Sequence, residues 1–138
     1  MKKTLLPKPP VALACGLLED GNRALFLLRK DALGREALEL PCALVFAGEN
    51  PVFLLSAEFK RQTGIDGQVH AIIMEGRQNV GSRRERIFVP VLVFKVTSKS
   101  ASAKQASEFS GYEWLERREL AGRRLGRNLE WLRFKNRA

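Results

Sequence analysis

Charged residues with the clearest potential for chemistry lie in the middle of the chain, where Glu49, Glu58 and Arg61 are spaced along a largely apolar segment. Carboxylates that converge on one point can hold a hard divalent cation, which needs several oxygen ligands. Arg61, however, follows Glu58 by three residues, so on a helix the two side chains would pair with each other. Glu58 is therefore either a residual ligand or general base, or one half of a structural ion pair, and the spacing favours the ion pair.

The segment that carries these residues has the signals of a helix. Asn50 is a good N-cap, Pro51 suits the first helical position, and Gly64 is a typical C-cap after about 13 helical residues. We expect Glu49 to face the N-terminus of this helix, where the dipole favours an anion. Its alternative roles are a peripheral metal ligand or a brace for the preceding loop.

Strand and turn signals surround this helix. Apolar runs at residues 11–19 and 23–30 flank an Asp-Gly-Asn turn and predict a β-hairpin, followed by a loop at 31–37. Further strands are expected over residues 68–78, 87–97 and 112–115, and Pro90 suggests an edge or a bulge. Residues 98–107 read as a mobile polar linker, and residues 116–120 as a short helical turn. This order indicates a mixed α/β fold of the α+β type rather than a doubly wound sheet.

Residues 123–137 predict a basic terminal helix, in which three leucines at i, i+4 and i+7 should dock on the domain. Its opposite face would carry Arg123, Arg127, Trp131 and Phe134. Such a face can stack on bases while its charges meet phosphates, or it can dock on a protein partner or a membrane. The alternative is that both aromatic side chains pack on the domain and the arginines are solvated.

Composition indicates one globular domain of 138 residues, with 45% hydrophobic and 28% charged residues and a net charge of +9. We expect residues 1–10 to be a disordered lead and residues 11–138 to form the domain, terminal helix included. The segment from Arg117 to the end of the sequence contains eight basic and two acidic residues, and this excess of positive charge favours acidic partners. Cys15 and Cys42 indicate free buried thiols, and no apolar run is long enough to span a bilayer, so we expect a cytoplasmic protein without a membrane partner.

Position by position, residues 43–65 resemble the Nudix box, G-x5-E-x7-R-E-U-x-E-E-x-G-U, where U is a bulky aliphatic residue. The end of the box matches at Thr63-Gly64-Ile65, and its first glutamate matches at Glu49. Other anchors of the resemblance are Leu40-Pro41 and a late segment with Glu108, Tyr112, Trp114 and Glu119-Leu120. The resemblance extends over residues 11–120 and implies a Nudix-like αβα sandwich, with the box helix against a mixed β-sheet.

The departures from the box bear on chemistry. In the Nudix family the box glutamates ligate Mg²⁺ or Mn²⁺, which activates water to attack a diphosphate. Here the Arg-Glu pair is Ala57-Glu58 and the Glu-Glu pair is Arg61-Gln62, so Glu58 is the only carboxylate left at those four positions. A metal cation beside Arg61 is electrostatically unfavourable, so these departures from the box imply no resident cofactor or metal. If a metal ion binds, the resemblance implies Glu58 as its ligand.

The same resemblance suggests an inverted role for Arg61, which would lie where the positive charge of the metal is expected. Arg61 could then hold a phosphate without hydrolysing it, with further contacts from Arg29, Lys30, Arg83 and Arg84. The alternative is that these side chains are solvated surface charges.

Val52 and Phe53 are a second departure, because they occupy positions that are commonly acidic and exposed in the family. They make the helix apolar on nearly every side, which indicates either tighter packing within the monomer or an interface with a second copy or a partner.

These observations favour a Nudix-fold protein with a degenerate box that binds a nucleotide-like ligand, a nucleic acid or a protein partner, including a second copy of itself. The alternative is a divergent metal-dependent hydrolase of nucleoside diphosphate derivatives. That enzyme would use Glu49 and Glu58 with Mg²⁺ or Mn²⁺ and ligands from elsewhere in the fold.

Overall fold

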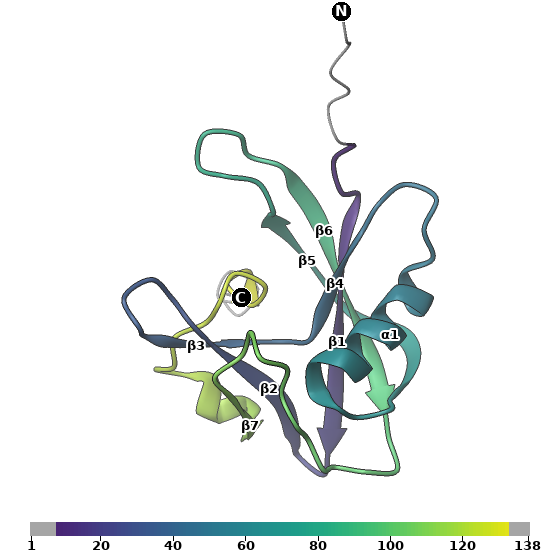
Figure 1. The fold of residues 1–138 in the computed structure, drawn as a ribbon, viewed down its shortest axis with the longest axis vertical. Coiled ribbons are helices and arrows are strands. Elements are labelled where there is room, and N and C mark those ends of the chain that lie inside the picture. The colour runs from purple at the N-terminus through teal and green to yellow at the C-terminus, as the bar shows by residue number, and fades with distance from the viewer. Residues whose placement is uncertain (1–7, 133–138) are drawn as a thin grey trace, which may run out of the picture.

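A computed structural model describes residues 8–132 and shows a mixed β-sheet of seven strands with one α-helix against it (Figure 1). The sheet order is β3-β2-β1-β6-β5, while β4 pairs with β1 and β7 pairs with β2. This confirms the predicted α+β class. The elements are β1 (Ala12–Asp20), β2 (Arg23–Lys30), β3 (Glu36–Glu39), β4 (Cys42–Val45), α1 (Pro51–Thr63), β5 (Gln68–Asn79), β6 (Phe88–Thr97), β7 (Gly111–Glu116) and the 3-10 helix η1 (Arg117–Leu120).

Strand β1 organises the sheet, because it pairs with three other strands. Its first half is antiparallel to β4, its last two residues are antiparallel to β2, and its other edge runs parallel to β6. Residues 12–16 are buried, as expected for a strand that is covered on both faces. The predicted hairpin between β1 and β2 is confirmed, with Asp20 opposite Arg23 and a two-residue turn in which Gly21 has a φ of 67°.

Helix α1 begins and ends where the sequence predicts. The Asn50 side chain accepts hydrogen bonds from the backbone N–H groups of Val52 and Phe53, and Gly64 closes the helix with a left-handed φ of 73°. The ring of Phe59 is buried so tightly against β1 that a Cβ atom on Gly16 would lie 2.8 Å from it. A glycine at that position of β1 therefore lets the helix approach the sheet.

The segment between β6 and β7 positions a charged side chain next to α1. The predicted linker, residues 98–107, is anchored to the end of α1, because Lys104 N donates to Thr63 O at 2.8 Å and Ala106 N donates to Gln62 O at 3.0 Å. These two bonds bring Glu108 beside the helix. Pro90 of β6 is paired with Arg77 of β5, whereas pairing of β6 with β1 begins only at Val91, so at Pro90 the β1 side of β6 is an edge, as predicted.

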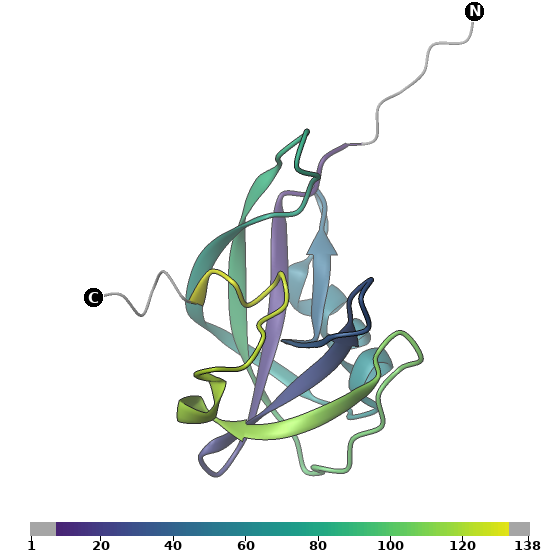
Figure 2. The same cartoon turned by 90° about the vertical axis from the view of Figure 1, so that its left-hand side faces the viewer.

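The face of the sheet opposite α1 is covered by residues 121–132, seen in Figure 2 at the yellow end of the chain. The predicted terminal helix is wrong for residues 123–131, which form turns and a bridge between Leu125 and Leu38. Leu129 and Trp131 from this segment are buried in the main core. Between residues 8 and 132, the second layer of the expected αβα sandwich is thus irregular chain, and the rest of the predicted helix, residues 133–137, lies outside the described residues.

Within residues 8–132, no helix combines the length and the apolar character needed to cross a membrane.

Candidate functional site

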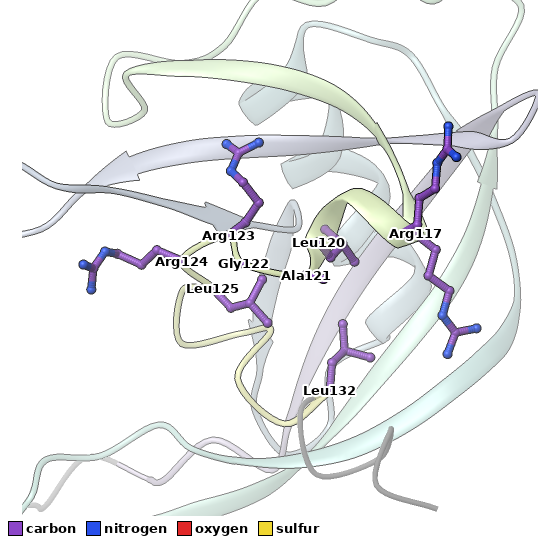
Figure 3. Close-up of a pocket in the computed structure, with 9 residues that line it drawn as sticks. Arg117, Leu120, Ala121, Gly122, Arg123, Arg124, Leu125 and Leu132 are labelled. Atoms are coloured by element: carbon purple, nitrogen blue, oxygen red, sulfur yellow. The ribbon is translucent and has the colours of Figure 1, made fainter.

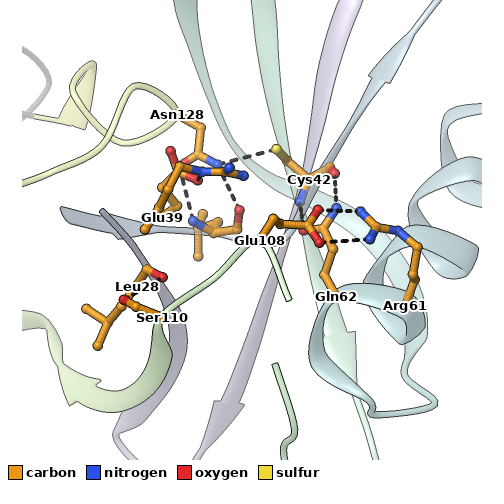
Figure 4. Close-up of polar contacts among 10 residues, drawn as sticks. Leu28, Glu39, Cys42, Arg61, Gln62, Glu108, Ser110 and Asn128 are labelled. Carbon is orange, nitrogen blue, oxygen red and sulfur yellow. Dashed lines mark hydrogen bonds and ion pairs between the residues drawn. The ribbon is translucent and has the colours of Figure 1, made fainter. Parts of the chain in front are cut away.

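The last two turns of α1 and the loop before β7 meet at Arg61. The Arg61 guanidinium lies between two carboxylates, and its Nε donates to Glu58 Oε2 at 2.6 Å. Its Nη1 and Nη2 donate to the two oxygens of Glu108 at 3.0 and 2.8 Å (Figure 4). The Glu58–Arg61 ion pair predicted from their spacing is confirmed. The contact with Glu108, 47 residues further along the chain, was not predicted. An acidic residue ahead of the β7 segment was the one signal that pointed toward it.

Electrostatics within this cluster follow from the contacts. The hydrogen bond from Arg61 is the largest cause that holds the pKa of Glu108 below its usual value of 4.5. In return, Glu108 and then Glu58 raise the pKa of Arg61, which therefore stays charged. Half of the Arg61 side chain is exposed, so solvent screens these pairs and each stabilises the fold only weakly. With two carboxylates and one guanidinium, the cluster carries a formal charge of −1.

The donor set does not fit a divalent cation as it stands. Glu58 and Glu108 are the carboxylates that converge, and the guanidinium already occupies the point where they meet. Mg²⁺ and Mn²⁺ require several oxygen ligands, and a neighbouring arginine would repel them. The described residues, 8–132, contain no cluster of three or more His, Cys, Asp and Glu side chains arranged for a metal.

Gln62, the next residue along α1, joins the helix to β4. Its Oε1 accepts from Cys42 N at 3.2 Å, and its Nε2 donates to Cys42 O at 2.8 Å. Only 5% of Gln62 is exposed, so these bonds satisfy polar groups that have lost water. A carboxylate at this position could accept from Cys42 N but could not donate to Cys42 O. The amide therefore has a structural role that a box glutamate could not fill when ionised.

Glu49 braces the loop before α1. Its Oε1 accepts from Phe46 N at 2.8 Å, and its own N–H donates to Phe46 O at 3.0 Å. The helix N-terminus is capped instead by Asn50. The expectation that Glu49 faces the helix N-terminus is thus corrected in favour of the loop-bracing alternative, since its carboxylate serves the turn.

The basic side chains expected around Arg61 are only partly brought together. Arg29 donates through Nε to Glu39 at 2.9 Å and stacks over the ring of Phe109, with 4.7 Å between its guanidinium carbon and the ring centre. It thereby lies next to the loop that carries Glu108. Lys30 is exposed at the end of β2. Arg83 and Arg84 lie on the loop between β5 and β6. This loop projects away from the β2–β3 turn in both Figure 1 and Figure 2.

The predicted basic aromatic face is not formed by the described residues. Trp131 is buried, and its indole Nε1 donates to Asn128 O at 2.6 Å. Arg127 donates through Nη2 to the carbonyl oxygens of Asn79 and Gly81 at 2.8 and 2.9 Å. The alternative in which the aromatic side chain packs on the domain is therefore correct for Trp131. Phe134 lies outside the described residues.

A pocket of about 670 Å³ lies beside η1 (Figure 3). Leucine side chains and arginines line it, with Leu120, Leu125 and Leu132 near the middle of Figure 3 and the arginine side chains extending outward around them. The arginines are Arg117, Arg118, Arg123 and Arg124. Arg118 pairs with Glu116 at 2.6 Å and Arg123 pairs with Glu113, so nearby acids balance part of the basic charge around the pocket. The pocket combines an apolar lining with a basic rim.

The first turn of α1 exposes apolar surface. Phe53 is 73% exposed and Val52 is 40% exposed, whereas Leu55 and Phe59 on the same helix are buried. Tighter packing within the monomer is therefore wrong as an explanation for Phe53. An interface with a second copy or a partner stays a prediction.

No family model matches the chain, and no curated protein sequence matches it. Solved structures do match: the MutT protein from Methanosarcina mazei Go1 is 20% identical with a TM-score of 0.63, over 97% of this chain and 100% of that one. A hydrolase of the Nudix family from Clostridium perfringens is 13% identical with a TM-score of 0.67, over 87% and 91%. The Nudix domain of Shewanella oneidensis NrtR, solved with ADP ribose, is 12% identical with a TM-score of 0.64, over 94% and 86%. This chain has the Nudix fold.

Proposed function

We propose that this protein is a binding module that holds a nucleotide-like ligand without hydrolysing it. The observation that carries the proposal is the position of Arg61, whose guanidinium fills the point where Glu58 and Glu108 converge. An internal cation at that point neutralises half of the carboxylate charge and leaves no oxygen cage for Mg²⁺ or Mn²⁺. A hydrolase that depends on such a metal would have to expel Arg61 first.

The class of ligand follows from charge and shape. A net charge of +9 favours an anion, and the pocket beside η1 offers a basic rim for phosphates and an apolar lining for a base or a sugar face. The Nudix domain of NrtR binds ADP ribose in its solved structure, which supports a nucleotide-like ligand for this chain as well. The Arg61 cluster itself carries a net negative charge, so it is a poor place for a phosphate.

Ligand binding is tested by thermal unfolding with ADP-ribose and ADP at millimolar concentration, in EDTA and separately in Mg²⁺ or Mn²⁺. Ligand at ten times its Kd stabilises the fold by about 1.4 kcal/mol, which corresponds to a rise in Tm of roughly 3–6 °C for a domain of this size. We expect this rise in EDTA, together with no metal-dependent loss of intact ligand. Ligand turnover that requires Mg²⁺ would overturn the proposal.

Two charge reversals locate the site. Arg124 lies on the rim of the pocket, and Arg84 is an exposed arginine on the separate β5–β6 loop. We expect Arg124→Glu to abolish the rise in Tm with ligand and Arg84→Glu, which changes the net charge equally, to keep it. The opposite pattern would move the ligand to the β5–β6 loop, and loss in both variants would show that net charge alone drives binding.

The role of Arg61 is tested separately by adding a carboxylate. In Arg61→Glu, three carboxylates would surround one point, and we expect millimolar MnCl2 to raise the Tm of this variant but not that of the wild type. Lys60→Glu is the matched control, since it makes the same charge change on an exposed residue one position earlier. Equal stabilisation of the wild type by MnCl2 would mean that Arg61 does not block the cation.

A divergent hydrolase is the second candidate, because Glu58 and Glu108 still point toward each other across the guanidinium. It predicts release of a phosphorylated product from ADP-ribose that requires Mg²⁺ or Mn²⁺ and is lost in both Glu58→Gln and Glu108→Gln. Binding of nucleic acid, self-association and a cytoplasmic location stay predictions.

A further inference from the structure

The two cysteines of the chain lie directly opposite each other on neighbouring strands. Cys15 of β1 is the register partner of Cys42 of β4 in an antiparallel pair. At the adjacent position, Gly16 N donates to Pro41 O at 2.9 Å, which identifies that position as a hydrogen-bonded pair. Because the two kinds of pair alternate along an antiparallel ladder, Cys15 and Cys42 form a non-hydrogen-bonded pair, in which side chains lie closer and Cα atoms are about 4.5 Å apart.

This spacing is compatible with a disulfide, for which Cα–Cα distances run from about 4.4 to 6.8 Å. Both cysteines are free thiols, and their side chains share the face of the sheet that bears the main core. Cys15 is fully buried there, whereas Cys42 is partly buried. A small oxidant would therefore meet Cys42 first, with Cys15 behind it as the resolving thiol.

The surroundings make the two thiols chemically unequal. A hydrogen bond from Cys15 is the largest cause that lowers the pKa of Cys42, and a second hydrogen bond comes from Asn128 Nδ2 at 3.4 Å. The same contact with Cys42, followed by burial, raises the pKa of Cys15. Since the thiolate is the reactive form, Cys42 is the nucleophile of the pair.

We propose that Cys15 and Cys42 are a redox modification site that closes to a disulfide when the protein meets a peroxide. The Cys42 thiolate attacks one oxygen of hydrogen peroxide, the O–O bond breaks, and hydroxide leaves to give a sulfenic acid. The Cys15 sulfur then attacks the Cys42 sulfur, the S–O bond breaks, and water leaves. In sum, two thiols lose two electrons and two protons, and one peroxide becomes two waters.

Oxidation at this pair would act where three parts of the fold meet. The backbone of Cys42 is bound by Gln62 of α1, and its sulfur accepts from Asn128, which also donates to Leu40 O at 2.7 Å. The bond would thus fix the junction between β1, β4 and the segment 121–132. The proposal stands independently of any ligand at the pocket beside η1.

The experiment treats the folded full-length protein with a small excess of hydrogen peroxide and then counts free thiols by alkylation and intact mass. We expect two alkylatable thiols per denatured chain to fall to none, with a mass loss of about 2 Da, no covalent dimer on a non-reducing gel, and full recovery with dithiothreitol. Retention of both thiols, a dimer linked by disulfides, or a mass gain from sulfinic acid would each overturn the proposal.

Single variants separate the roles of the two sulfurs. In Cys15→Ala, Cys42 lacks its resolving thiol, so a sulfenic acid should accumulate and be trapped by dimedone. In Cys42→Ala, the buried Cys15 should stay reduced under the same treatment. Dimedone labelling of Cys15 in Cys42→Ala at the rate seen for Cys42 would contradict the assigned order of attack.

Discussion

Arg61 and Gln62 are neighbours on α1 that meet opposite environments. Arg61 is half exposed and lies between two carboxylates, whereas the side chain of Gln62 is buried and binds the backbone of Cys42 in β4. Both occupy positions at which the resemblance to the Nudix box leads one to expect glutamates. Water screens the charges around Arg61, so this position can lose its charge at little cost to folding. The position of Gln62 cannot hold a free charge, because its partners are a buried N–H and a buried carbonyl.

Removal of the amide is the largest expected effect. Gln62→Ala leaves the N–H and C=O of Cys42 without their partner and opens space in a packed region, so we expect the free energy of unfolding to fall by about 3 kcal/mol. Urea unfolding monitored by circular dichroism measures this, with Lys60→Ala as the exposed control on the same helix. A loss below about 1 kcal/mol would mean that water replaces the amide.

A glutamate at position 62, as in the Nudix box, tests whether this buried position tolerates a negative charge. Gln62→Glu should cost about 2 kcal/mol near neutral pH, because an ionised carboxylate keeps the bond from Cys42 N but faces the carbonyl oxygen of Cys42. A protonated carboxyl group can donate to that oxygen, so the difference from the wild type should narrow as the pH falls. A difference that is independent of pH would show that the carboxylate has turned out to solvent.

Removal of the guanidinium should have a smaller effect. Arg61→Ala should cost about 1 kcal/mol or less, since both of its ion pairs are exposed. Arg61 depresses the pKa of Glu108 in the folded state, so its contribution exists above the unfolded pKa and is lost as the pH falls through the folded pKa. The stability difference should therefore disappear in acid. In a carboxyl titration by NMR, the pKa of Glu108 should rise in this variant, and an unchanged value would mean that another group sets it.

The smallest effect on stability is expected at the other end of α1. Phe53→Asp should change the free energy of unfolding by less than about 0.5 kcal/mol, because the ring is already exposed. If the first turn of α1 is a self-association surface, this variant should sediment as a monomer at concentrations where the wild type forms a dimer. Leu33→Asp, on an equally exposed leucine of the β2–β3 turn, is the matched control and should sediment like the wild type.

Local signals in the sequence were sufficient to predict the β1–β2 hairpin and helix α1. The turn at Gly21 and the caps at Asn50 and Gly64 depend on residues within a few positions of each other, and so does the Glu58–Arg61 pair. The contact between Arg61 and Glu108 depends instead on how the linker folds back along α1. A prediction based on spacing has no access to that path, so the second half of the cluster was missed.

The terminal segment shows how tertiary contacts override a periodic pattern. Leucines at helical spacing predicted a helix, but Gly126 N donates to Leu38 O at 2.7 Å, and a Cβ atom on Gly126 would lie 2.9 Å from that oxygen. The glycine permits a close approach to β3 that a helix would not make. Trp131 likewise packs on Gly76, where a Cβ atom would lie 2.4 Å from the indole. A glycine inside a helical pattern was the overlooked signal.

The bonds between residues 38–40 and residues 124–128 have a consequence for the order of events during synthesis. Asn128 pairs with the backbone of Leu40 across a separation of 88 residues, and Leu38 exchanges backbone bonds with the same late segment. A nascent chain on the ribosome can form the β1–β2 hairpin and α1 early, because their contacts are local. The core on the face of the sheet opposite α1 stays uncovered until the late segment has left the exit tunnel. Chains stalled before that point expose apolar side chains and are candidates for chaperone binding.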